Sequence, residues 1–349
     1  MDEKKQLIEA LRTVLYPGID RDIVTLGYVK DVSLIEGRWT VRVDLSPRAA
    51  GAATEIESRV RAVLEATRIA SALDLRVAAA PAAPSEPAPP PMPSDPLAGV
   101  RYKIAVASGK GGVGKSTVAV NLAVAMARLG RSTGLLDADI YGPSAPIMFG
   151  REDDRPRVRD QQLVPIEAHG VRTMSIGYMI ERGTPVIWRG PMVSKALDQM
   201  MGDVDWSGVE VLIFDLPPGT GDVQISLAQK TSLTGAVIVS TPQDVALIDA
   251  AKAVAMFSKV QVPILGLIEN MSYFSCPSCG HRAEIFRHGG AAREAARLDV
   301  PFLGEIPLDP EVVMGGDQGR PIVERKAEAP ASLAFFELAR RLLASLDER

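Results

Sequence analysis

The glycine-rich stretch from Ser108 to Thr117, S-G-K-G-G-V-G-K-S-T, constrains this chain of 349 residues more than any other feature. An apolar run from Tyr102 to Ala107 precedes it, and apolar residues at helical spacing follow it. A strand, a glycine turn and a helix start in this order are typical of a phosphate-binding loop. We therefore expect an α/β fold in which a parallel sheet is flanked by helices.

The residue types of this loop match the chemistry of a nucleoside triphosphate. Its glycines let consecutive backbone N–H groups turn toward one anion at the start of a helix. Lys115 is expected to reach the β- and γ-phosphates, and the Ser116 hydroxyl is expected to ligate Mg²⁺. A flexible glycine turn is the alternative. The predicted nucleotide-binding residues here are Gly109, Lys110, Gly111, Gly112, Val113, Gly114, Lys115, Ser116 and Thr117.

Three aspartates follow two predicted strands. The strand over residues 131–136 leads into D-A-D, and the strand over residues 209–214 leads into Asp215. Because parallel strands open onto the ligand crevice at their carboxyl ends, these side chains should face the phosphates. Asp139, supported by Asp137, is the candidate for orienting the attacking water, and Asp215 is the candidate partner of Mg²⁺. A carboxylate that only caps the next turn is the alternative for Asp139.

The two cysteines of the chain, Cys276 and Cys279, form a C-P-S-C segment in a predicted loop. Two thiolates at this spacing can hold one metal ion or one edge of a cluster, but they are too few for a complete site. A symmetric dimer would supply four thiolates to a [4Fe–4S] cluster. A single chain could instead bind zinc by adding His281 and His288. The same spacing also fits a thiol pair that cycles through a disulfide, or an inert pair.

The chain is predicted to have three parts. Residues 1–78 predict a small α+β domain, with helices over residues 3–16 and 54–70 and strands over residues 32–35, 39–45 and 75–77. Residues 79–97 form an Ala/Pro-rich linker, because eight prolines between Pro81 and Pro96 exclude a helix interior or a central strand. Residues 98–349 form the nucleotide-binding domain, in which strands continue to alternate with helices. Its last helix, residues 331–346, is expected to dock on the sheet rather than on a membrane.

Charge and hydropathy exclude several classes of partner. A net charge of −4 and an isoelectric point near 5.6 do not support bulk electrostatic binding of nucleic acid or membrane. The N-terminus lacks an apolar signal core, and no apolar run reaches the roughly 18 residues that a membrane-spanning helix needs. We expect a cytoplasmic protein with no stable membrane association and no nucleic-acid partner.

Five motifs together resemble the Mrp/ApbC family of iron–sulfur cluster carrier ATPases. They are S-G-K-G-G-V-G-K-S-T, L-L-D-A-D-I-Y-G-P-S, D-L-P-P-G-T-G-D, I-E-N-M-S and C-P-S-C-G, and they lie between about Tyr102 and Pro310. Near the N-terminus, Y-P-G-I-D-R-D-I-V-T-L-G-Y-V-K-D-V resembles the opening of a small iron–sulfur assembly domain. Such domains often have a cysteine before their second helix, where this chain reads S-P-R-A-A-G-A. A docking or regulatory role is therefore favoured there over direct metal chemistry.

The resemblance implies a homodimeric ATP hydrolase of slow turnover. It would carry a [4Fe–4S] cluster between the two chains on Cys276 and Cys279, receive it from scaffold proteins and deliver it to apo-proteins. Lys110 resembles the second lysine of a deviant P-loop, which reaches the phosphates of the partner subunit as an arginine finger does. Asn270 resembles the residue that binds adenine, with an Asn cap as the alternative. Two competing functions are a positioning or partitioning ATPase with a structural zinc at the C-P-S-C loop, and a regulatory scaffold that barely hydrolyses nucleotide.

Overall fold

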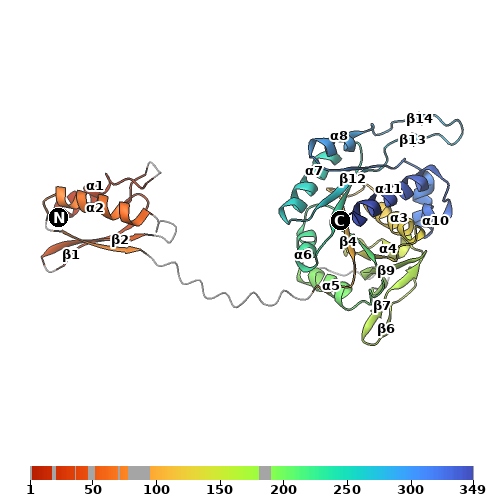
Figure 1. Cartoon of the computed structure of the whole chain (residues 1–349), viewed down its shortest axis with the longest axis horizontal. Coiled ribbons are helices and arrows are strands. Elements are labelled where there is room, and N and C mark those ends of the chain that lie inside the picture. The colour runs from red at the N-terminus through yellow and green to blue at the C-terminus, as the bar shows by residue number, and fades with distance from the viewer. Residues whose placement is uncertain are drawn as a thin grey trace. The chain divides into compact units, whose positions relative to one another are not determined.

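A computed structural model describes residues 2–17, 21–35, 37–45, 52–69, 71–77, 95–180 and 190–348 of the chain. The chain divides into two compact units, residues 1–91 and 92–349 (Figure 1). Most of the predicted linker lies outside the described residues. Residues 95–97, which the prediction placed in that linker, pack in the large unit, where Leu97 is buried.

The small unit is a three-stranded sheet with two helices packed on it (Figure 1). Strand β1 is antiparallel to β2, and β3 is parallel to β2, with α2 as the crossover between β2 and β3. Apolar residues of both helices and the sheet form one core, as the helical and alternating patterns predict. The elements are α1 (Asp2–Leu11), β1 (Val29–Ile35), β2 (Arg38–Leu45), α2 (Ala53–Ala66) and β3 (Ser71–Val77).

Both helices of the small unit are shorter than predicted. Helix α1 ends at Leu11 because the chain turns back, so that Leu15 forms a β-bridge with Asp22. Helix α2 ends before Arg68, whose φ of 54° lies in the left-handed region and cannot continue a helix. The apolar residues among 12–16 and 67–69 therefore make contacts within the flanking turns and do not extend the helices.

The large unit is built on an eight-stranded sheet in the order β15-β12-β11-β4-β10-β5-β9-β8. Within the described residues, neighbouring strands of this sheet are parallel, apart from β8, which runs antiparallel to β9. The predicted fold class, a largely parallel sheet flanked by helices, is confirmed. The strands are β4 (Tyr102–Ala107), β5 (Thr133–Asp137), β8 (Ile166–Ala168), β9 (Val171–Ser175), β10 (Val211–Asp215), β11 (Gly235–Ser240), β12 (Ile264–Glu269) and β15 (Phe302–Glu305).

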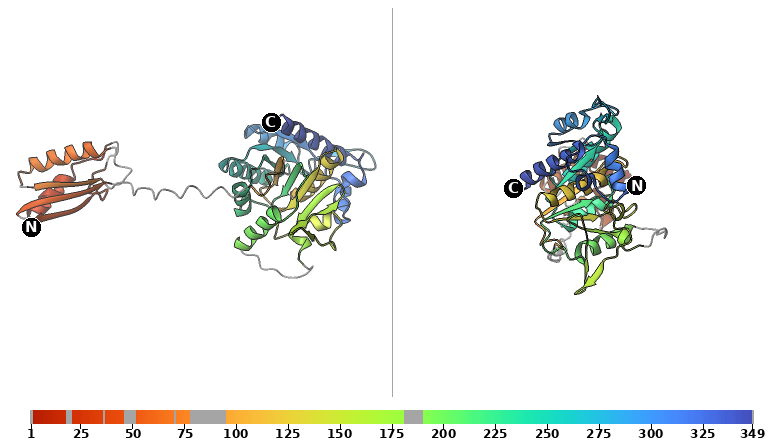
Figure 2. Two further views of the ribbon diagram at one scale, coloured as in Figure 1. Left: turned by 60° about the horizontal axis from the view of Figure 1, so that its bottom comes forward. Right: turned by 90° about the vertical axis from the view of Figure 1, so that its right-hand side faces the viewer.

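Helices cover both faces of this sheet (Figures 1 and 2). In β4, Ile104 and Val106 face one core, whereas Ala105 and Ala107 face the other, so the strand is buried on both sides. The C-terminal helix docks on the first face, as predicted. That face carries α3 (Lys115–Arg128), α4 (Ala145–Met148), α10 (Ile322–Arg325) and α11 (Pro330–Asp347), and the other carries α5 (Gly190–Gly202), α6 (Asp222–Lys230), α7 (Asp244–Lys259) and α8 (Gly290–Arg297).

Two hairpins lie outside the main sheet. One pairs β6 (Arg157–Arg159) with β7 (Gln162–Val164), and the other pairs β13 (Phe274–Ser275) with β14 (Arg282–Ala283). The second one, which carries both cysteines and is called the cysteine hairpin below, follows β12 and projects from the body of the unit in Figure 1. The described part of the chain also contains a 3₁₀ turn, Ile176–Tyr178, and α9 (Pro310–Asp317). Among the described residues, none of the helices is both long enough and apolar enough to cross a bilayer.

Candidate functional site

The loop between β4 and α3 requires glycine at several positions for steric reasons. Gly112 and Gly114 both have φ of +81°, in the left-handed region that glycine adopts without strain. A Cβ atom on Gly114 would lie 2.2 Å from Asn270 Nδ2. A Cβ atom on Gly109 would lie 2.1 Å from the backbone of Asp249 in α7. These close approaches argue against a merely flexible turn, because neighbouring elements hold the loop in one shape.

Three polar groups expected at the phosphates and Mg²⁺ lie together. The Lys115 ammonium is 2.5 Å from Asp215 Oδ1 and 3.0 Å from Ser116 Oγ. Lys115 and Asp215 come from the neighbouring elements α3 and β10 and are almost fully buried. An ammonium, a hydroxyl and a carboxylate at a helix N-terminus are a donor set that suits a phosphate chain with its Mg²⁺.

Asp137, at the end of β5, is fully buried and accepts several hydrogen bonds. Its donors are the backbone N–H groups of Asp139, Ser144 and Ala145 and the hydroxyl of Ser175, all at 3.0–3.1 Å. Burial, and next the nearby charge of Asp215, raise the pKa of Asp137 to about 7. Asp137 therefore shapes the turn that follows β5 and does not face solvent, and its predicted support of Asp139 stays a prediction.

Asp139 is half-buried and lines a cavity of about 880 Å³. Burial raises the pKa of Asp139, and the positive charge of Lys115 opposes that effect. The cavity is also lined by Pro217 and Gly221 of the loop after β10. Asp139 thus borders a cavity shared with the loop after β10, and its charge interacts with that of Lys115.

Gln224, which the sequence analysis missed, holds the loop that follows Asp215. Its Nε2 donates to the carbonyl groups of Pro217 (2.8 Å) and Gly219 (3.1 Å), and its Oε1 accepts the Gly221 N–H at 3.0 Å. The Gly219 N–H donates in turn to the carbonyl of Ser108 beside the phosphate-binding loop. The only sequence signal was a glutamine at the third position of α6, which is typical of a capping box.

Asn270 follows β12 and contacts the phosphate-binding loop directly. Its Nδ2 donates to the carbonyl of Val113 at 2.8 Å, and the residue is 7% exposed. The structure thus gives Asn270 a contact with the loop backbone. The predicted contact with adenine stays a prediction.

Cys276 and Cys279 lie in the turn of the cysteine hairpin. The Cys276 N–H donates to the carbonyl of His281, and the Gly280 N–H donates to the carbonyl of Cys276. Both thiols are free; Cys276 is half-buried and Cys279 is exposed. Hydrogen bonds from the backbone N–H groups of Ser278 and then Cys279 lower the pKa of the Cys276 thiol. The turn therefore favours a thiolate, the form that binds metals.

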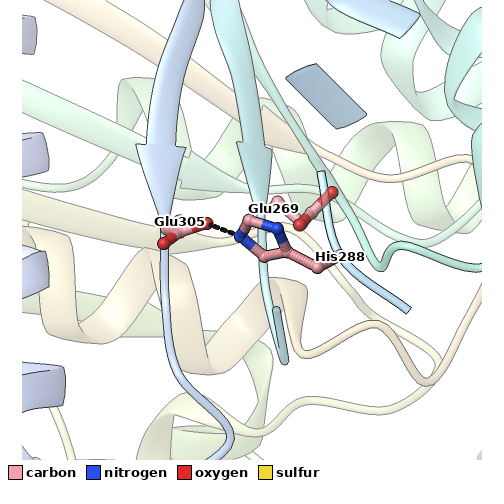
Figure 3. A group of neighbouring side chains, drawn as sticks. All are labelled: Glu269, His288 and Glu305. Carbon is pink, nitrogen blue, oxygen red and sulfur yellow. Dashed lines mark hydrogen bonds and ion pairs between the residues drawn. The ribbon is translucent and has the colours of Figure 1, made fainter. Parts of the chain in front are cut away.

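The single-chain zinc site proposed from the sequence is not assembled. His288 Nε2 lies 2.6 Å from Glu305 Oε2, in a cluster that also contains Glu269 (Figure 3). Across the described part of the chain, no group of three potential metal-binding side chains includes either cysteine. The zinc alternative is therefore not favoured.

A parallel sheet whose central strand leads into a phosphate-binding loop, with the loop lysine paired to a carboxylate on the next strand, defines a P-loop NTPase. Residues 99–343 match the family model described as ParA, NUBPL iron-transfer P-loop NTPase, and the chain belongs to this family. Residues 4–69 match a second family model, that of iron–sulfur cluster assembly proteins.

The relatives are similar over long alignments. An iron–sulfur cluster carrier protein of Deinococcus radiodurans is 44% identical over 98% of this chain and 95% of its own length. A mitochondrial iron–sulfur protein of Arabidopsis thaliana, required for NADH dehydrogenase, is 51% identical over 72% of this chain and 81% of its own. A solved nucleotide-binding protein of Archaeoglobus fulgidus, in complex with ADP, is 39% identical with a TM-score of 0.60, covering 69% of this chain and 93% of its own.

Proposed function

We propose that this chain is an iron–sulfur cluster carrier that binds and slowly hydrolyses ATP. Two copies hold a [4Fe–4S] cluster between their cysteine hairpins and transfer it to apo-proteins. The observation that carries this proposal is the pair of free cysteines, one with a lowered thiol pKa, on a hairpin that projects from a P-loop NTPase. The names of the relatives, iron–sulfur cluster carrier proteins, support it.

A dimer follows from the number of sulfur donors. A [4Fe–4S] cluster is usually held by four cysteine thiolates, and each chain has Cys276 and Cys279 alone. A two-fold axis between two hairpins would bring the two pairs together. The cluster is the cargo of this arrangement, received from scaffold proteins and passed to recipients whose thiols replace those of the carrier.

ATP is bound and hydrolysed by the buried polar groups at the phosphate-binding loop. Lys115 and the backbone N–H groups of Gly109 to Thr117 hold the phosphates, and Ser116 with Asp215 holds Mg²⁺. Asp139 orients the attacking water. Lys110, half-buried at the rim of the loop, reaches the phosphates of the partner subunit and stabilises the charge of the phosphoryl group in transfer.

The N-terminal domain recognises the apo-proteins that receive the cluster. Residues 1–78 act as a docking domain, the chain that follows them tethers it, and the ATPase begins at residue 95, because Asp95 and Leu97 pack in the large unit. The match of residues 4–69 to iron–sulfur cluster assembly proteins supports this assignment. Asn270 contributes to the binding of adenine beside the loop.

The test is anaerobic reconstitution with Fe²⁺ and sulfide, followed by absorption spectroscopy, iron and sulfide analysis and mass measurement. The wild-type chain is expected to bind one cluster per two chains. The double variant Cys276→Ser/Cys279→Ser should lose iron and sulfide but keep its ATP affinity, because neither thiol belongs to the phosphate-binding loop and serine preserves the size of the side chain. The matched control, Lys115→Ala, should keep the cluster and lose hydrolysis.

Two outcomes would contradict the proposal. The first is a thiol-free variant that retains the wild-type content of iron and sulfide. The second is a protein that stays monomeric under reducing, oxygen-free conditions with its cluster fully ligated by one chain.

A further inference from the structure

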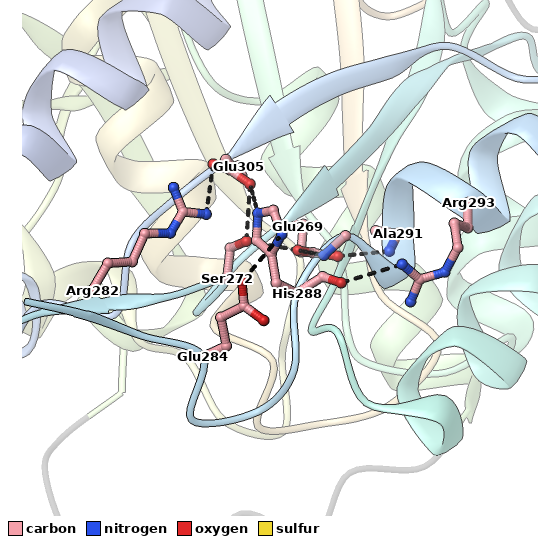
Figure 4. Close-up of polar contacts among 9 residues, drawn as sticks. Glu269, Ser272, Arg282, Glu284, His288, Ala291, Arg293 and Glu305 are labelled. Carbon is pink, nitrogen blue, oxygen red and sulfur yellow. Dashed lines mark hydrogen bonds and ion pairs between the residues drawn. The ribbon is translucent and has the colours of Figure 1, made fainter.

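Four side chains meet where β12 and β15 end, and we call this group the junction: Glu269, Ser272, His288 and Glu305 (Figures 3 and 4). Glu269 and Glu305 are the last residues of two adjacent parallel strands and are paired in register. His288 enters from the segment that precedes α8. The metal-type ligand atoms of Glu269, His288 and Glu305 lie within 4.8 Å of one another. None of the activities assigned above uses this group.

Glu269 is fully buried and fixes the start of α8. Its Oε1 accepts the Gly289 N–H at 2.8 Å and the Ser272 hydroxyl at 2.6 Å, and its Oε2 accepts the Ala291 N–H at 2.6 Å. A carboxylate at this place is stabilised by the N–H groups and by the positive end of the helix dipole. Helix α8 is therefore held to the end of β12 through one side chain.

The junction adjoins the nucleotide site along the chain. Asn270 comes directly after Glu269, and its side chain holds the carbonyl of Val113 within the phosphate-binding loop. The same side chain is so close to Gly114 that a Cβ atom there would clash with it. Any change of the loop around bound phosphates therefore acts on Asn270, and through one peptide bond on Glu269.

The junction adjoins the cysteine hairpin on its other side. Glu305 Oε1 lies 3.4 Å from the guanidinium of Arg282 in β14 (Figure 4). Arg282 stacks over the ring of Tyr273 at 3.6 Å, and that ring and the His288 imidazole meet edge to face. The carbonyl of Tyr273 accepts the Leu308 N–H. Both strands of the hairpin are thus attached to the residues around Glu305.

His288 is the nearest hydrogen-bond donor to Glu305. Ser272 lies 2.6 Å from Glu269 and 3.1 Å from Glu305, and its single hydroxyl proton serves the nearer carboxylate. Glu305 Oε2 then depends on the imidazole N–H of His288 at 2.6 Å. These contacts satisfy both carboxylates without a metal ion. A metal would have to displace the bond between His288 and Glu305, so the arrangement favours a structural link.

We propose that the junction couples the nucleotide site to the cysteine hairpin, with His288 as the positioning residue of this link. Nucleotide at the loop shifts Asn270 and Glu269, and the bond from His288 to Glu305 passes this shift to Arg282 and to the turn that holds Cys276. This inference rests on the proposed function, because it describes how nucleotide binding at the loop would change the residues that hold the cluster. The coupling is between the nucleotide site and the two thiols, and it can be measured in protein that carries no cluster.

The experiment measures the alkylation rate of the two thiols in the cluster-free, full-length protein. The rate is compared without nucleotide and with Mg²⁺ and a non-hydrolysable ATP analogue. In the wild type we expect the two rates to differ by about fivefold or more, the lower end of coupling between sites. His288→Leu should bring the ratio to about one, since Glu305 Oε2 then loses its nearest donor. His288→Gln should restore most of the ratio, because its amide can donate.

His281→Leu is the matched control, an exposed histidine of the same hairpin whose backbone rather than side chain bonds Cys276. Its ratio should equal that of the wild type. Thermal unfolding checks each variant, and Glu305→Gln tests the same bond if His288→Leu does not fold.

Three results would overturn the inference. The wild type could show equal thiol reactivity with and without nucleotide, or His288→Leu could keep the wild-type ratio. The third is stoichiometric Co²⁺ binding by Cys276→Ser/Cys279→Ser that disappears when His288→Leu is added, which would make the junction a metal site. Because the readout needs no cluster, its failure is distinct from the loss of iron and sulfide that tests the proposed function.

Discussion

At the residue scale, the protonation of Asp137 follows from where the sheet places it. Its carboxyl group is buried beside Asp215, so the ionised form loses solvation and meets a second negative charge. The resulting pKa of about 7 is well above the ordinary value of 3.8. A carboxyl group whose pKa is raised in the folded state stabilises the fold at low pH, and that contribution is lost as pH rises from about 4 to about 7.

Replacing Asp137 with Asn should therefore flatten the pH dependence of stability. In the nucleotide-free protein, the free energy of unfolding of the wild type should fall relative to that of Asp137→Asn as pH rises from about 4.5 to about 7.5. The slope is up to about 1.4 kcal/mol per pH unit. Denaturant titrations across this range measure it, with Asp153→Asn, an exposed position, as the control. Parallel curves for wild type and Asp137→Asn would contradict the assignment.

Single residues of the site differ in how far the sequence could reveal them. The spacing of the loop predicted that Lys115 and Ser116 lie together, and the strand-end rule predicted Asp215 beside them. Gln224 had only its place in the first turn of a helix, and the sequence indicated His288 only as a possible zinc ligand. Each acts through contacts with residues distant in the sequence or with backbone groups of a turn, and a pattern of residue types does not encode those contacts.

At the element scale, the phosphate-binding loop is shaped by helix α7 as much as by its own sequence. The backbone of Asp249 lies against Gly109, whereas a Cβ atom on Gly111 would find its nearest neighbour, Pro218 Cγ, at 4.0 Å. The two glycines of this motif are therefore under different steric constraints. Gly109 is needed for packing between elements, and Gly111 leaves space on the open side.

This contrast predicts different effects of the same substitution. Gly109→Ala should lower the free energy of unfolding by about 1–3 kcal/mol, because backbone must move to admit the methyl group. Gly111→Ala should stay within about 0.5 kcal/mol of the wild type. Chemical denaturation of the nucleotide-free protein compares them. Equal stability of the two variants would show that α7 does not confine the loop.

The existence of most elements could be predicted, but their ends could not. Continuous apolar runs located β4, β10, β11 and β12, because strands buried on both faces are apolar throughout, and helical spacing of apolar residues located α7. The end of α2 depends on the left-handed conformation of Arg68, and the reversal of β8 depends on a tight turn at His169 and Gly170, both with positive φ. The residue type alone does not predict that Arg68 or His169 adopts this left-handed conformation.

At the scale of the whole molecule, the two units have separate cores. The apolar core of the small unit contains residues of 7–64, and the two cores of the large unit contain residues from 97 onward. The residues that directly precede β4 also contribute to the stability of the large unit. Lys103, which is 6% exposed, lies 2.6 Å from Asp95, and Asp95 accepts the hydroxyl of Thr231 as well.

Truncation should therefore be tolerated up to a sharp limit. A chain of residues 92–349 should fold and bind ATP like the full chain. A chain of residues 98–349 lacks Asp95 and leaves a buried ammonium without its carboxylate, so it should be less stable by about 3–5 kcal/mol. Thermal unfolding and nucleotide titration of both chains measure this. Equal stability of the two truncations would show that the ion pair contributes nothing to the large unit.

The order of strands separates two kinds of chemistry. Strand β4 leads into the phosphate-binding loop and is paired on both sides in the middle of the sheet, whereas the cysteine hairpin follows β12, one strand from the edge. A hairpin of another length, or with other sulfur or nitrogen donors, would leave every central strand with its present neighbours. The hairpin can therefore acquire other donors during evolution while the strands around the phosphate-binding loop stay unchanged.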